Sequence, residues 1–169
     1  MPLEDKVAAA KQIDKLLRDL LSSGGFLLKY RIIVDPPVED RDWERPEIMV
    51  AFSGPDAPLL LERGAELLRS FEHVTQKMLR LESEEHDKVV FDCMNHRAMR
   101  LEELRLAANV AAEKVLKTGV PYEFAPMTAR ERRIVHLALR DHPDLKTESH
   151  GEGTRRSVMV LPKNTKPKK

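Results

Sequence analysis

The sequence predicts an α+β fold in two units, and three observations lead to this prediction. The first is the composition: 169 residues, 41% of them hydrophobic, suit one domain or two small ones. The second is the order of apolar patterns from residue 3 to residue 117, which predicts helix, strand, strand, helix, helix, strand and long helix. This order favours helices packed on one face of a three-stranded sheet. The third is a second, shorter series of strands and a helix after Pro121.

The first helix and the first two strands follow directly from the apolar spacing. Between residues 3 and 21 the apolar residues recur at helical spacing, and Ser22-Ser23-Gly24-Gly25 ends the pattern. FLLKYRIIV at 26–34 is expected to be a strand, and IMVAF at 48–52 the next one. The proline-containing, acidic segment 36–47 connects the two strands, so we expect them to pair antiparallel.

Two helices, a strand and a long helix complete the first series. GPDAP at 54–58 predicts a turn into a short helix, and 65–81 has the apolar spacing of an amphipathic helix. The segment 88–93 is expected to be a third strand. A long helix is expected from about 96 to 117, with Gly119 as its C-cap. Its inward residues share one face: Leu101, Leu104, Ala108, Ala111 and Val115.

The second series is shorter and ends in a polar tail. It consists of a short strand at 122–124, a helix at 128–140, and two strands at 145–149 and 156–161. The two last strands are joined by the turn HGEGT. The lysine- and proline-rich segment 162–169 has no packing capacity and is expected to be disordered.

Charge and cysteine content describe the compartment and the class of partner. The single cysteine, Cys93, cannot form an internal disulfide, and the sequence has no secretory signal and no membrane-spanning apolar stretch. We therefore expect a cytoplasmic protein. From Thr128 to the end there are eleven Lys or Arg against five Asp or Glu, whereas the preceding part carries a net negative charge. A basic C-terminal part favours a polyanionic partner.

The predicted helix at 128–140 begins with a defined start signal. Thr128-Ala-Arg-Glu131 is a capping box, in which the threonine hydroxyl caps a backbone donor and the glutamate reaches back to the cap. The capping box fixes the register of the helix. Its expected buried stripe is Ile134, Val135, Ala138 and Leu139.

This register places Arg132 and His136 side by side, one helical turn apart. Arg133 and Arg140 extend the positive surface. Such a face can bind phosphate through the guanidinium group and stack a base on imidazole or guanidinium. The spacing alone does not identify a site, because the pair Arg69–His73 repeats it within an otherwise ordinary helix.

The surrounding residues make the pattern specific. PMTARERRIVHLAL, followed by TESHGEGTRRSVMVL, resembles the R-three-H domain, a single-stranded nucleic-acid-binding module named for its Arg-x-x-x-His signature. The resemblance is strongest to bacterial Jag-type proteins, which join a KH domain to this module. It implies a type II-like KH domain connected by a long helix to a small α+β domain. The implied segments are KH-like 1–95, connecting helix 96–119, R-three-H 120–161 and tail 162–169.

The resemblance also implies a set of binding residues. Arg132 and His136 form the signature pair, and the paired arginines before the last strand are expected phosphate contacts. The candidate nucleic-acid-binding residues are Arg130, Arg132, Arg133, His136, Arg140, Arg155 and Arg156. For Arg156, an ion pair with Glu148 or Glu152 across the turn is an open alternative.

The KH-like part departs from its family at the loop that should grip nucleic acid. GPDAPLLLERGAELL at 54–68 resembles the segment that carries the GxxG loop of Jag-type KH domains. An ungapped comparison puts Glu62, Arg63, Gly64 and Ala65 at the GxxG positions, so both glycines are replaced. We expect a degenerate loop, with a helix surface that exposes Glu62 and Arg63 as the favoured conformation and a shifted loop that uses Gly64 as the alternative. We then expect the C-terminal unit to provide most of the affinity for nucleic acid.

The sequence thus predicts a non-enzymatic protein with neither cofactor nor metal site, because the histidines and Cys93 show no metal-ligand spacing and no catalytic motif is present. The expected partner is single-stranded RNA, with single-stranded DNA left open. The alternative is a protein–protein adaptor that uses the KH-like part as its interaction surface. For this adaptor role, the resemblance to the Jag-type family implies a connection with cell elongation or membrane insertion. It also implies a small KH-domain partner or a homodimer.

Overall fold

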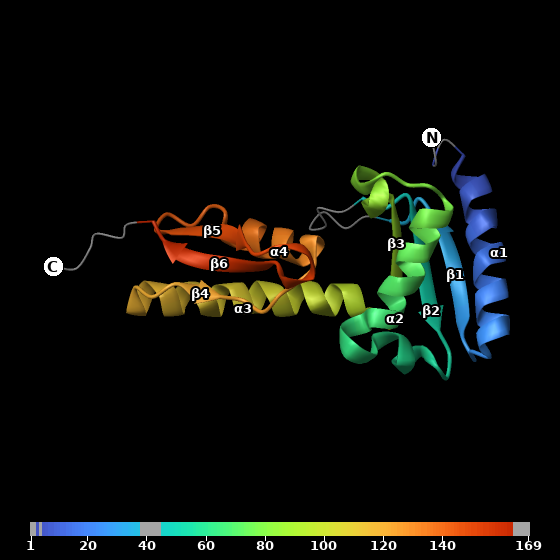
Figure 1. Ribbon diagram of the computed structural model, residues 1–169, viewed down its shortest axis with the longest axis horizontal. Helices are drawn as coiled ribbons and strands as arrows, with labels where there is room; N and C mark the ends of the chain where they lie inside the picture. Colours follow the sequence, from blue (N-terminus) through green and yellow to red (C-terminus); the bar gives the residue numbers. More distant parts are fainter. Residues whose placement is uncertain (1–2, 4, 38–44, 164–169) are drawn as a thin grey trace. The chain divides into compact units, whose positions relative to one another are not determined.

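The computed structural model describes residues 3, 5–37 and 45–163. The chain divides into two units, residues 1–97 and 98–169, each with its own three-stranded sheet (Figure 1). The predicted connecting helix, α3 (His96–Thr118), belongs to the second unit from Ala98 onward.

The first unit follows the predicted order of elements. They are α1 (Lys6–Gly24), β1 (Lys29–Val34), β2 (Ile48–Ser53), α2 (Ala57–Met78), the 3-10 helix η1 (Ser83–Lys88) and β3 (Val89–Cys93). The sheet order is β1-β2-β3. The predicted antiparallel pairing of β1 with β2 is confirmed, with Lys29 opposite Ser53. The strands β2 and β3 run parallel, and the sequence pattern did not indicate η1.

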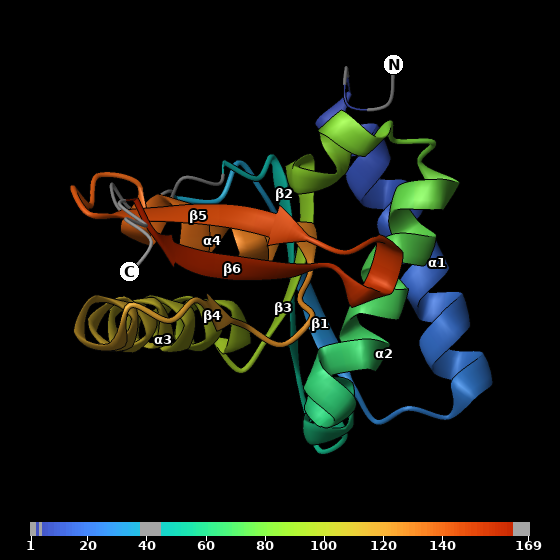
Figure 2. The same ribbon diagram turned by 60° about the vertical axis from the view of Figure 1, so that its left-hand side comes forward.

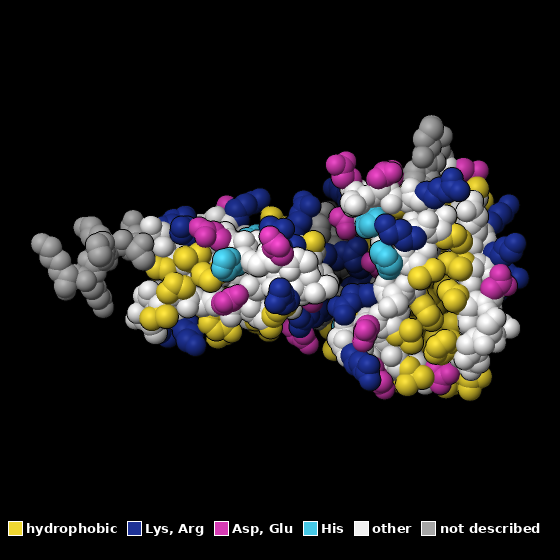
Figure 3. Space-filling model, in the orientation of Figure 1, with side chains coloured by type: hydrophobic (Ala, Val, Ile, Leu, Met, Phe, Trp, Pro, Cys, Tyr) yellow, Lys and Arg dark blue, Asp and Glu magenta, His cyan; other side chains and the backbone are white. Residues whose placement is uncertain are grey.

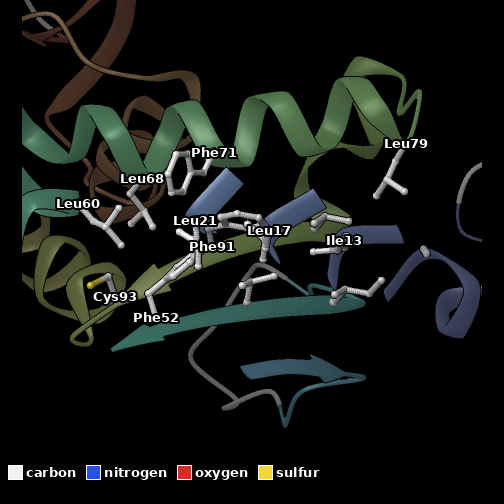
Figure 4. Close-up of a cluster of buried hydrophobic side chains, with 14 of the residues drawn as sticks. Ile13, Leu17, Leu21, Phe52, Leu60, Leu68, Phe71, Leu79, Phe91 and Cys93 are labelled. Carbon is white, nitrogen blue, oxygen red and sulfur yellow. The ribbon is translucent and has the colours of Figure 1, made fainter. Parts of the chain in front are cut away.

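Alternate residues of the strands form the core of this unit. Ile48, Val50 and Phe52 of β2 lie on the same face as Val89 and Phe91 of β3, and all five are buried. Figure 4 shows the rings of Phe52 and Phe91 covered by apolar residues of α1 and α2. Both helices therefore pack on one face of the sheet, as the apolar periodicity predicted.

The start and the stop of α1 have clear local causes. The Asp5 carboxylate accepts the amide of Ala8 at 2.9 Å and caps the N-terminus. Gly25 adopts a left-handed conformation (φ 67°) and ends the helix after Gly24, where the sequence placed the stop. Val7, part of the predicted apolar pattern, is 58% exposed and lies outside the buried stripe.

The outer edge of β3 is closed by side chains of α2. The carboxylate of Glu72 accepts the Phe91 amide at 2.8 Å. Gln76, one turn further along α2, donates to the carbonyl of His86 at 3.1 Å and so holds η1 in place. These contacts satisfy backbone hydrogen-bonding groups that would otherwise lack a partner at the edge of a sheet.

The second unit packs two helices against a sheet of order β4-β6-β5 (Figure 2). Its elements after α3 are β4 (Tyr122–Glu123), α4 (Ala129–Leu139), β5 (Leu145–His150), the 3-10 turn η2 (Gly153–Arg155) and β6 (Ser157–Pro162). Both strand pairs of this sheet are antiparallel. The predicted strands and helices of this part are confirmed to within about two residues at each end.

Three details of the second unit differ from the prediction. Ala138 is exposed, so α4 buries only Ile134, Val135 and Leu139. The buried face of α3 includes Ala112 in place of half-exposed Leu101. The chain stays ordered through Pro162, the last residue of β6, and the Lys163 amide donates to the carbonyl of Asp144 at 2.8 Å. The rest of the predicted tail, 164–169, lies outside the described residues.

The predicted helix surface at 62–65 was wrong, whereas the predicted division into a short helix and a second helix starting near residue 65 is confirmed. Arg63, Gly64 and Ala65 have positive φ angles of 50°, 68° and 62°, and Glu62 is extended. Within α2 these residues form a left-handed loop between two helical segments. Ala65 turns its methyl group into the core, where it is 2% exposed. That burial offsets a backbone strain of roughly 1 to 2 kcal/mol at each of the two non-glycine positions.

Candidate nucleic-acid interface

The start of α4 is fixed by the predicted capping box, which the structure confirms. The Thr128 hydroxyl accepts the Glu131 amide at 3.2 Å, and the Glu131 carboxylate accepts the Thr128 amide at 2.8 Å. The same carboxylate accepts the Arg100 side chain of α3 at 2.8 Å. Burial acts to raise the pKa of Glu131, but the hydrogen bonds from Arg100 and Thr128 hold it below its ordinary value. The ionised Glu131 therefore joins α4 to α3.

Arg132 and Arg156 are brought together through the backbone of Met127. The Arg132 guanidinium donates to the Met127 carbonyl at 2.9 Å, and the Met127 amide donates to the Arg156 carbonyl at 3.1 Å. Burial and the neighbouring charge of Arg156 both lower the pKa of Arg132. The two guanidinium groups are thus close enough to repel each other, although they are 24 residues apart in the chain.

No carboxylate neutralises this pair within the described parts of the chain. The open alternative for Arg156 was an ion pair with Glu148 or Glu152. Glu148 instead pairs with Lys146 at 2.8 Å, which lowers the pKa of Glu148. Among the residues that the structure describes, Arg156 forms an ion pair with neither glutamate.

His136 lies one turn after Arg132 and faces β5. Its Nδ1 is 2.7 Å from the hydroxyl of Thr147, and its Nε2 is 3.0 Å from the hydroxyl of Ser149. Burial, followed by the charges of Arg132 and Arg156, lowers the pKa of His136. The imidazole is therefore held neutral between two hydroxyl groups, and both of its nitrogen atoms are engaged. Stacking of a base on this ring stays a prediction.

The other predicted cations are distributed unevenly. Arg133 and Arg155 are exposed, and Arg130 is half-buried on the first turn of α4. Arg140 lies at the opposite end of α4, about 12 Å along the axis from Arg132. Its guanidinium contacts the Asp141 carboxylate at 3.3 Å, which neutralises it. Arg132 and Arg156 form the cation cluster, and the neutral His136 lies one helical turn after Arg132.

A glycine in the β5–β6 turn allows Arg155 and Arg156 to take their places. Gly151 has a φ of +83°, and a Cβ atom on it would lie 2.9 Å from the carbonyl oxygen of Arg155. Only glycine lets the two sides of the turn come this close.

Sequence reasoning did not identify Thr147, Ser149 or Gly151 as parts of the site. The available signal was their position within TESHGEG: alternate residues of a strand face the same side, and the glycine follows directly. The loop Glu62–Ala65 belongs to the first unit, and its failure as a GxxG grip stays a prediction.

Comparisons with known proteins place the cation cluster in a recognised domain. Residues 102–162 match the R-three-H domain family, so the chain is an R-three-H-domain protein. The match starts within α3, which makes most of that helix part of the domain.

Relatives extend the similarity into the first unit. The chain is 32% identical over 127 residues to the RNA-binding protein KhpB of Clostridium symbiosum, covering 75% of this chain and 57% of the relative. It is 33% identical over 110 residues to the RNA-binding protein KhpB of Bacillus subtilis, covering 64% of this chain and 53% of the relative. The chain is a homologue of KhpB, and its resemblance to the Jag-type family is confirmed. It spans about half the length of these two relatives.

No helix in the described ranges is long and apolar enough to cross a membrane. Within the same ranges, no three His, Cys, Asp or Glu side chains come together in a way that could hold a metal ion. The relatives are named for RNA binding and not for a reaction, in agreement with the expectation of a non-enzymatic protein.

Proposed function

We propose that this protein binds single-stranded nucleic acid, RNA foremost, through its R-three-H domain. The observation that carries the proposal is that Arg132 and Arg156 both contact the backbone of Met127, while neither forms an ion pair with a carboxylate in the described structure. Two like charges held together in this way are stabilised by an anion, and guanidinium groups match phosphate geometry. The names of the KhpB relatives give RNA as the nucleic acid of those proteins. A cytoplasmic location goes with this proposal.

The loop Glu62–Ala65 of the KH-like unit supports the proposal that the R-three-H domain, and not the first unit, provides most of the nucleic-acid binding. Glu62 is exposed at the start of the left-handed loop, where its carboxylate repels phosphate. Ala65 replaces a glycine and has its methyl group buried, so the loop backbone is not bare at this position. The first unit therefore contributes little grip at the GxxG position, and the R-three-H domain carries the binding.

Binding of labelled, unstructured RNA to the full chain tests this proposal. The change Arg132→Gln/Arg156→Gln is expected to weaken the affinity at least about tenfold, and to reduce the salt dependence by about one phosphate contact for each arginine lost. A matched control is Lys117→Gln/Lys146→Gln, which removes two exposed cations of the same unit that are paired with Glu113 and Glu148. The control should bind like the wild type. Equal affinity of both variants and the wild type contradicts the proposal.

A second role, as a protein–protein adaptor, is favoured by the surface of the first unit. Figure 3 shows hydrophobic side chains gathered over the region between α1 and α2. Val7, Leu27, Leu59 and Val74 of this unit are 44% to 66% exposed. Exposed apolar residues of this kind mark contact surfaces when they are contiguous. A small KH-domain partner or a second copy of the chain fits this role. Light scattering of the full chain, compared with its Val74→Asp variant, measures self-association through this surface.

A further inference from the structure

The His136 imidazole is bracketed by two hydroxyl groups of one strand. Thr147 and Ser149 are two residues apart on β5, so their side chains point to the same side, toward α4. The distances of 2.7 Å and 3.0 Å to the two ring nitrogens are those of well-formed hydrogen bonds. Sequence reasoning treated His136 as a ligand contact, whereas its nitrogens are occupied by the protein itself.

A neutral imidazole has one N–H donor and one lone-pair acceptor. The ring of His136 is held neutral by its burial and by the charges of Arg132 and Arg156, which lower its pKa. It must therefore donate to one hydroxyl and accept from the other. The hydroxyl that donates has used its only proton. The hydroxyl that accepts from the ring keeps its own O–H free to donate to a third group.

The sheet register indicates which hydroxyl keeps its proton free for a ligand. Ser149 is opposite Val158, two residues from Arg156, whereas Thr147 is opposite Val160, four residues from Arg156. Along a strand this is a difference of about 6.6 Å. Ser149 is thus the hydroxyl next to the guanidinium pair, where a bound anion would be held. A free O–H there adds a third donor to a site that already has two cationic ones.

We propose that Ser149 donates its hydroxyl to the nucleic-acid phosphate held by Arg132 and Arg156, and that His136 is the positioning residue that orients it. In this arrangement Nε2–H of His136 donates to Ser149 Oγ, and Nδ1 accepts the proton of the Thr147 hydroxyl. This inference rests on the proposed function. It adds to the two guanidinium groups an uncharged hydrogen-bond donor on β5.

Two single substitutions in the full chain separate the two hydroxyls, with a fluorescein-labelled oligouridine as the probe. Ser149→Ala is expected to weaken binding about tenfold, because a hydrogen bond to a charged phosphate is lost. Thr147→Val removes the hydroxyl on the other side of the ring, which acts on the ligand only through His136, so its loss of affinity should be smaller than that of Ser149→Ala. Ser149→Thr restores a hydroxyl and should recover most of the affinity. Wild-type affinity of Ser149→Ala, or a larger loss in Thr147→Val, overturns the assignment.

The tautomer of His136 tests the assignment without any binding measurement, because a merely structural role of the ring would not require the proton on one particular nitrogen. Long-range proton–nitrogen NMR spectra of the wild type should show the proton on Nε2. A proton on Nδ1 refutes the assignment independently of any RNA measurement. If the wild type binds no oligouridine, the proposed function fails together with the role of Ser149. If the wild type binds and Ser149→Ala binds equally well, only the inference fails.

Discussion

At the scale of single residues, the cation cluster is held in place by residues that carry no positive charge. Met127 links Arg132 to Arg156 through its backbone, and Gly151 permits the turn that precedes Arg156. The hydroxyls of Thr147 and Ser149 fix His136. None of these neutral residues stands out by charge or spacing in the sequence. The contacts of His136 with Thr147 and Ser149, and of Met127 with Arg156, join residues 11 to 29 positions apart, which a local pattern cannot reveal.

The neutral state of His136 predicts that the second unit loses stability in mild acid. Its pKa is lowered by burial and by two arginines, so the unfolded chain binds more protons than the folded one below the ordinary pKa of 6.5. The stabilising contribution is fully present above that value and declines as the pH falls below it toward the folded-state pKa. Thermal melts at pH 7.5 and pH 5.5 measure the decline. His136→Gln should reduce the difference between the two pH values, and an unchanged difference would show that other groups cause it.

The close approach at Gly151 predicts a substitution effect with an internal control. Gly151 and Gly153 both have positive φ angles, 83° and 54°, so alanine is strained at either position. Only at Gly151 would the Cβ atom also meet a backbone oxygen, at 2.9 Å, since Gly153 has open space around it. Gly151→Ala should therefore lower the free energy of unfolding by at least about 1 kcal/mol more than Gly153→Ala. Chemical denaturation of the two variants checks this, and equal losses would contradict the described turn.

At the scale of elements, the helices and strands were more predictable than their irregularities. The stop of α1 at Gly25 and the capping box of Thr128 and Glu131 were predicted, because each depends on residues close in sequence. The left-handed loop within α2 was not. A positive φ at Arg63 and Ala65 is unfavourable locally and is maintained by tertiary packing, above all by the buried methyl group of Ala65.

The attachment of α4 to α3 predicts unequal effects of two glutamates that share one arginine. Arg100 contacts Glu131 at 2.8 Å and Glu103 at 3.1 Å. Glu131 is 17% exposed and also completes the capping box, whereas Glu103 is 63% exposed. Glu131→Ala should lower the free energy of unfolding by about 1 to 2 kcal/mol, and Glu103→Ala by less than about 0.5 kcal/mol. Similar losses in urea denaturation would mean that the capping box adds nothing to an ordinary surface pair.

At the scale of the whole molecule, the sequence predicted the α+β class, the order of elements and the R-three-H domain, because periodicity and a specific motif determine them. It did not predict that only some of the candidate cations converge. Arg140 was included because it lies on the same helix, yet its contact with Asp141 and its distance along α4 separate it from Arg132. The domain boundaries at 95 and 119 stay predictions, although the contacts of α3 group most of it with the second unit.

The contact between Glu72 and the Phe91 amide also affects whether the strand of another molecule can pair with β3. An extended segment of another molecule that approached β3 would need this N–H group as a donor, and the carboxylate already occupies it. The incoming chain would meet a negative charge instead of an open hydrogen-bonding position. The side chain of Glu72 thus hinders the addition of a further strand next to β3 in the first unit.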